Sequence, residues 1–145
     1  MKRILMAVSA LAFLAAGSLS QAQAGNEVIV EQYGSYNGTA ASQHGKRNKA
    51  FLYQLGRRNM ATAVQDGRRN RAVIGQEGAR NFAETYQEGR RNVSGIAQFG
   101  TDHTATTEQY GSGNASATIQ VGHGQSAETY QVGKGNMSIV VQGGH

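Results

Sequence analysis

The sequence predicts an all-β protein, a cross-β solenoid of 11-residue strand-turn units with two strands in each 22-residue coil and about 5.5 coils. Three observations support this fold class. Glutamine and glycine recur in a fixed phase, apolar or small residues alternate with polar ones between them, and the 145 residues include no proline and no cysteine. Neither a disulfide framework nor a large apolar core is therefore expected to hold the protein together.

An 11-residue repeat is the strongest signal in the chain. Glutamine recurs at every eleventh position: Gln32, Gln43, Gln54, Gln65, Gln76, Gln87, Gln98, Gln109, Gln120, Gln131 and Gln142. Glycine follows two residues later: Gly34, Gly45, Gly56, Gly67, Gly78, Gly89, Gly100, Gly111, Gly122, Gly133 and Gly144. Asparagine lies three residues after the glycine: Asn37, Asn48, Asn59, Asn70, Asn81, Asn92, Asn114 and Asn136, with His103 and Gln125 in its place in two units.

An 11-residue period is also typical of a right-handed helical coiled coil. That alternative fails because every unit contains a glycine, which costs about 1 kcal/mol inside a helix. The unit that contains Asn48, Ala50, Leu52 and Gln54 places these residues two apart. A period of two puts them on one face of a strand.

Each unit is predicted to form a strand of about seven residues and a four-residue turn at Gly-x-x-Asn, where glycine allows a positive φ. Two units complete a coil, so each strand is expected to lie parallel to the strand two units earlier.

Asparagine and glutamine are predicted to face inward with two rows of smaller residues between them. Only six inward positions carry a sizeable aliphatic side chain, namely Val28, Val30, Leu52, Ile74, Ile96 and Val140. A buried amide is unfavourable unless its donors and its acceptor are paired. Stacked identical amides meet this requirement if each one bonds the copies above and below it, as in the ladders of cross-β structure. The repeated glutamines and asparagines are therefore the candidate functional residues.

The first 24 residues are predicted to be a secretory signal peptide. Lys2 and Arg3 precede an apolar run over residues 4–16, and the Ala22-Gln23-Ala24 segment suits cleavage before Gly25. The apolar run is too short to span a bilayer as a helix. Residues 25–145 are therefore expected to form one exported solenoid domain, not an integral membrane protein.

The repeat resembles that of the curlin family. Residues 54–61 (QLGRRNMA) and 109–114 (QYGSGN) match its pattern Gln-x-Gly-x-x-Asn-x-Ala-x-x-x-Gln, and the resemblance extends over residues 26–145. It implies a subunit of curli, the extracellular functional amyloid of biofilms. It also implies secretion through the periplasm by a dedicated outer-membrane channel with periplasmic accessory proteins, and contact with other curlin subunits. Whether this chain is the main subunit or a minor, surface-held nucleator stays open, because the long glycine-rich segment of major curlins is missing and the repeats are rich in arginine.

The repeat pattern runs from Asn26 to Gln142 without the polar caps that a monomeric solenoid uses. Both ends are therefore expected to accept another copy, and a head-to-tail contact that does not close produces a filament.

The turns carry most of the basic residues. Turns after even-numbered units share one edge, so a basic turn edge is predicted that consists of Lys46, Arg47, Arg68, Arg69, Arg90 and Arg91. One interpretation is a solvated edge whose repulsion restrains premature stacking. The other is capture of extracellular polyanions such as DNA, lipopolysaccharide or acidic subunits, and a basic solenoid that binds polyanions without polymerising is the alternative function.

The two outer faces are predicted to differ. Odd-numbered units present Phe51, Tyr53, Val73, Val93, Phe99, Ile119, Val121, Ile139 and Val141. Even-numbered units present Glu84, Glu88, Glu108 and Glu128 with Tyr86 and Tyr130. The apolar face suggests lateral bundling or adhesion, but ordinary strand propensity explains the same residues.

Enzyme function is not predicted, and no cofactor or metal is expected. The chain lacks cysteine, and His44, His103, His123 and His145 do not have the spacing of metal ligands.

Overall fold

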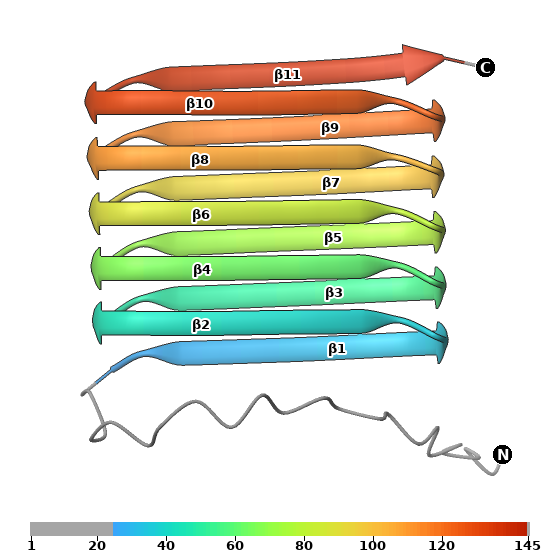
Figure 1. Cartoon of the computed structure of the whole chain (residues 1–145), viewed down its shortest axis with the longest axis horizontal. Coiled ribbons are helices and arrows are strands. Elements are labelled where there is room, and N and C mark those ends of the chain that lie inside the picture. Colours follow the sequence, from blue (N-terminus) through green and yellow to red (C-terminus); the bar gives the residue numbers. More distant parts are fainter. Residues whose placement is uncertain (1–24, 145) are drawn as a thin grey trace, which may run out of the picture.

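The computed structural model describes residues 25–144, which form a β-solenoid of stacked strands and no helix, as predicted. The strands are β1 (Glu27–Ser35), β2 (Gly38–Lys46), β3 (Lys49–Arg57), β4 (Met60–Arg68), β5 (Arg71–Ala79), β6 (Phe82–Arg90), β7 (Val93–Thr101), β8 (Thr104–Ser112), β9 (Ala115–His123), β10 (Ser126–Lys134) and β11 (Met137–Gly144). Figure 1 shows β1 and β11 at opposite ends of the stack. The expected signal peptide lies outside the described residues.

Two parallel sheets form the two layers of the solenoid. The six-stranded sheet has the order β1-β3-β5-β7-β9-β11, and the five-stranded sheet has the order β10-β8-β6-β4-β2. Paired residues are one coil apart, so Gln32 pairs with Gln54 and Gly34 with Gly56. The prediction that each strand lies parallel to the strand two units earlier is confirmed.

The predicted division of the unit into seven strand residues and four turn residues is wrong. Most strands have nine residues and continue through the repeated glycine, which pairs with the glycine of the next coil. Only two residues, such as Arg58 and Asn59, lie between consecutive strands. The ladder of parallel hydrogen bonds therefore extends further than the turn signal of glycine suggests.

The second residue after each repeated glycine turns the corner in a left-handed conformation, a feature that the sequence analysis missed. In most units it is not glycine: Tyr36, Arg47, Arg58, Arg69, Arg80, Arg91 and Asp102 have φ between 56° and 59°. In the last corners it is Gly113, Gly124 or Gly135, with φ between 69° and 71°. The recurrence of those three glycines at 11-residue spacing is the signal that could have revealed it.

The core between the sheets is thin. Leu52, Ile74 and Ile96 are the large aliphatic side chains buried in it, among rows of alanine. Val28 and Val30 occupy the same rows but are 45% and 43% exposed, because β1 lies at the end of the described stack. The predicted apolar outer face is exposed on the six-stranded sheet, as Val93, Phe99 and Val121 show.

Towards the C-terminal end, hydroxyl groups replace aliphatic carbon in the core. Thr85 bonds Ser94 at 3.1 Å, whereas the buried hydroxyl oxygens of Thr107, Ser116, Thr118 and Thr129 have no partner among the described residues. An unpaired buried hydroxyl is unfavourable, so this half of the core is less stable than its hydrogen-bonded framework suggests.

Thr118→Val is expected to raise the free energy of unfolding by about 1 kcal/mol, because it removes an unpaired hydroxyl between Ile96 and Val140. The matched control is Thr85→Val, which leaves the Ser94 hydroxyl unpaired and is expected to lower stability by about 1–2 kcal/mol. Denaturant unfolding measures both values. Equal effects of the two substitutions would contradict the conclusion that the Thr118 hydroxyl is unpaired and the Thr85 hydroxyl is hydrogen-bonded.

Candidate functional site

The glutamines form two continuous ladders along the solenoid, one in each sheet. Each Nε2 donates to the Oε1 of the glutamine one coil later, at 2.7 to 2.9 Å, from Gln32 to Gln142. The second Nε2 hydrogen binds a backbone carbonyl of the preceding strand, as Gln76 does with Met60 at 2.9 Å. Both donor hydrogens of the buried amides between the two ends of the stack are therefore satisfied, and these bonds join the two sheets.

The asparagines are arranged differently from the expectation. Each Oδ1 accepts from the backbone N–H of the residue one coil later, and Asn70 Oδ1 accepts from Asn92 N at 3.1 Å. Asn70 Nδ2 donates to the carbonyls of Asp66 and Gly89, at 2.9 and 3.3 Å. The expected side-chain-to-side-chain asparagine ladder is therefore wrong, because the amide saturates the backbone groups that the tight corner leaves unpaired.

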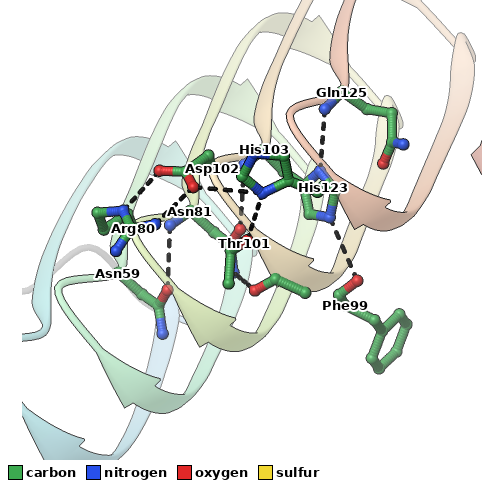
Figure 2. A network of polar contacts seen from close by, with 10 residues as sticks. Asn59, Arg80, Asn81, Phe99, Thr101, Asp102, His103, His123 and Gln125 are labelled. Atoms are coloured by element: carbon green, nitrogen blue, oxygen red, sulfur yellow. Dashed lines mark hydrogen bonds and ion pairs between the residues drawn. The ribbon is translucent and has the colours of Figure 1, made fainter. Parts of the chain in front are cut away.

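His103 takes the place of asparagine in one corner (Figure 2), and its ring replaces part of the missing amide. Its Nδ1 accepts from Gln125 N at 3.2 Å, and its Nε2 lies 3.2 Å from the Phe99 carbonyl, to which it donates as the neutral tautomer. The buried ring thus supplies the acceptor and one donor, whereas Asn81, one coil earlier, donates to two carbonyls, those of Glu77 and Gly100.

The glutamine ladders have a direction. At the β1–β2 end, Gln32 Oε1 and Gln43 Oε1 accept no hydrogen bond from residues 25–144. At the β10–β11 end, Gln131 and Gln142 each donate only to a backbone carbonyl, that of Ala115 or Ser126, and keep one Nε2 hydrogen for a further partner. The described stack therefore presents amide acceptors at one end and amide donors at the other.

The basic edge lies at the corners that follow β2, β4 and β6, where the sequence predicts it. It consists of Lys46, Arg47, Arg68, Arg69, Arg90 and Arg91. These residues line a groove of about 750 Å³ together with Ser112, Gly113, Lys134 and Gly135. The corners are stacked by backbone bonds, Arg69 N to Lys46 O at 3.0 Å and Arg91 N to Arg68 O at 2.9 Å. Among the described residues, no carboxylate lies within 4.0 Å of any of the six cationic groups.

Comparison with protein families agrees with this architecture. The curlin-associated repeat matches residues 37–67, 56–81 and 78–111, which together span more than half of the chain. The chain belongs to the curlin repeat family. A search of curated proteins finds no match. Curlin repeats belong to a family of structural proteins, and both this match and the β-solenoid fold fit a curlin-like structural subunit.

On the opposite edge of this curlin-repeat protein, Arg80 is paired with a carboxylate (Figure 2). Arg80 Nε and Nη2 donate to the two carboxylate oxygens of Asp102, both at 2.6 Å, and His123 Nδ1 lies 3.4 Å from Asp102. The hydrogen bond from Arg80 holds the pKa of Asp102 below its ordinary value, so the stabilising effect of this pair is present above the ordinary carboxyl range and is lost as the pH falls.

The outer face of the five-stranded curlin-repeat sheet carries a tyrosine row. The ring centroids of Tyr86 and Tyr110 are 5.5 Å apart, and those of Tyr110 and Tyr130 are 5.7 Å apart. Burial, followed by the charges of Glu88 and Glu108, raises the pKa of Tyr86 and Tyr110 respectively. This face is thus aromatic and acidic.

Within residues 25–144 no three histidines or carboxylates are grouped so that they could hold a metal ion. No helix in that range is long and apolar enough to cross a membrane.

Proposed function

We propose that this protein polymerises head to tail into an extracellular, curli-like amyloid fibre of the biofilm matrix. The observation that carries the proposal is the direction of the glutamine ladders. The outer edges of β1, β2, β10 and β11 have no strand partner among the described residues. One end presents two amide acceptors and the other presents two amide donors, so unlike ends are complementary and like ends are not.

The strand order also suggests how two copies join. Placing β1 of the next copy on β10, and its β2 on β11, continues both sheets without an empty position. Gln131 and Gln142 then donate to Gln32 and Gln43 of that copy, in the same register as within the chain. Because β1 would then continue the five-stranded sheet, successive copies are turned by half a revolution about the fibre axis. Such a contact does not close, and it therefore propagates a filament.

Gln131→Leu combined with Gln142→Leu is expected to slow fibre elongation at least tenfold. The substitution removes the two free donors at one end and leaves the buried acceptors of the incoming copy unpaired, at about 1–3 kcal/mol for each. Elongation is measured by adding monomer to fixed seeds, and cross-β order by the reflection near 4.7 Å.

The matched control is Tyr130→Gln with Val141→Gln, two outward-facing changes on the same strands. It is expected to elongate at the wild-type rate. Equal rates for the two double variants would remove the ladder from the mechanism, and a wild-type protein that stays monomeric would overturn fibre formation itself.

The route to the cell surface and the role within the fibre are also part of the proposal. The family resemblance supports secretion through the periplasm and the outer-membrane channel, and regular repeats favour a main subunit over a minor nucleator. N-terminal sequencing of the external protein is expected to begin at Gly25. Seeds of this protein that accelerate a partner curlin more strongly than their own monomer would assign the nucleator role instead.

We also propose that the basic edge captures extracellular polyanions, since its six cations have no carboxylate partner among the described residues. A protein that binds polyanions but never forms fibres would make this its main function.

A further inference from the structure

Three arginines of the basic edge occupy a backbone conformation that favours glycine. Arg47, Arg69 and Arg91 have φ of 59°, 58° and 58°. Gly113 and Gly135 occupy the equivalent corners of the next two coils, with φ of 69° and 71°. The fold therefore accepts glycine here, and a side chain at these corners is strained.

Charge adds a second unfavourable contribution at the same place. Successive coils are about 4.8 Å apart, so the cations of one coil lie close to those of the next and repel them. No carboxylate among the described residues offsets this repulsion, whereas Arg80, at the same kind of corner on the opposite edge, is paired with Asp102. This repulsion acts between coils of one chain, so it destabilises the folded chain itself.

The geometry points to a ligand that offsets the charge repulsion: we propose that the basic edge binds an extended acidic polysaccharide with a carboxylate on each sugar, laid along the solenoid axis. The edge offers a straight groove with a pair of cations at each of three successive coils. A polysaccharide with a carboxylate on each sugar carries its negative charges in a linear series, so a chain laid along the groove brings carboxylates to the cation pairs of successive coils. The planar guanidinium group binds a carboxylate with two parallel hydrogen bonds.

The groove suits a polysaccharide better than a nucleic acid strand. None of its lining residues is aromatic, so it lacks the platform on which single-stranded bases stack. A duplex presents each phosphate strand obliquely to a straight row, so only part of the row is in contact. Duplex DNA is therefore the competing ligand in the test.

The test compares two variants that each remove two arginines. Arg69→Gly with Arg91→Gly replaces two arginines of the basic edge by glycine, the residue that occupies the equivalent corner at position 113. The control, Arg57→Ser with Arg58→Gly, changes the opposite edge to the residues found at Ser35 and Gly124 in the same columns. Freshly purified full chain is titrated with polygalacturonate over a range of salt concentrations, and thermal unfolding is recorded for each protein.

Wild-type protein is expected to bind polygalacturonate with an affinity that falls as salt rises. The Arg69→Gly, Arg91→Gly variant is expected to bind about tenfold more weakly, as loss of two of six ionic contacts predicts. It is also expected to unfold at the same or a higher temperature than the wild type, which separates lost binding from lost fold. The control is expected to keep the wild-type affinity.

Three results would overturn the proposal: equal affinities of the wild type and the basic-edge variant, equal weakening in the control, or tighter binding of duplex DNA than of polygalacturonate. Equal weakening in the control would show that binding depends only on the net charge of the protein. Tighter binding of duplex DNA would show that the edge prefers phosphodiesters to carboxylates. Binding is measured before any fibre forms, so the outcome does not depend on whether the protein polymerises.

Discussion

Gly78→Ala is expected to lower the free energy of unfolding by more than about 3 kcal/mol and to prevent the protein from reaching its native stack. Gly78 has a φ of 122°, and a Cβ atom there would overlap the backbone carbonyl group of Gly100 in the next coil. Both obstacles are backbone features that recur along the column from Gly34 to Gly122, so neither can relax by moving one side chain.

The control for this substitution lies in the same strand. Gly75 in β5 has no positive φ, and a Cβ atom at this position would contact nothing within 4 Å. Gly75→Ala is therefore expected to be neutral or to stabilise by up to about 1 kcal/mol. Guanidinium unfolding followed by circular dichroism measures both variants, and equal stabilities would show that the glycine column is not a close backbone contact.

Gln76→Glu is the second substitution with a large expected effect, about 3–5 kcal/mol of lost stability at neutral pH. The Gln76 amide donates to Gln98 Oε1 at 2.8 Å and to Met60 O at 2.9 Å, and it is 1% exposed. A carboxylate there would direct negative charge at two acceptors in a buried site, with no cation to compensate it.

Gln142→Glu places the same change at the end of the ladder. Gln142 is only partly buried and donates to Ser126 O alone. Water reaches this end strand, so the expected loss in the free energy of unfolding of the monomer is below about 1 kcal/mol. A similar loss at both positions would show that the ladder is not tighter in the middle of the stack than at its end.

Much of the fold follows from periodicity alone. The spacing of Gln54, Gln76 and Gln98 predicts parallel strands one coil apart, and the structure confirms this pairing. The turn was less predictable. Glycine at position 56 suggests that the strand ends there, yet the strand continues to Arg57, because main-chain pairing between coils overrides the local preference of glycine.

The hydrogen bonds of the amide rows could likewise be predicted only in part from the sequence. Sequence alone places rows of glutamine and rows of asparagine in the interior, and it assigns them the same role because the two amides have the same donors and acceptors. Asn92 nevertheless bonds backbone groups at the corner, and Gln87 bonds another glutamine. Their positions decide this, since Asn92 lies between two strands, where corner backbone groups need partners, and Gln87 lies within a strand.

The sequence by itself determined the repeat, the parallel register of the strands, the inward amide rows and the family to which the chain belongs. Its period admits one regular solution that buries an amide together with copies of itself. Tertiary structure alone decided the unpaired state of the basic edge and the direction of the ladders. These depend on which atoms of adjacent coils meet at hydrogen-bonding distance, and residue spacing along the chain does not contain that information.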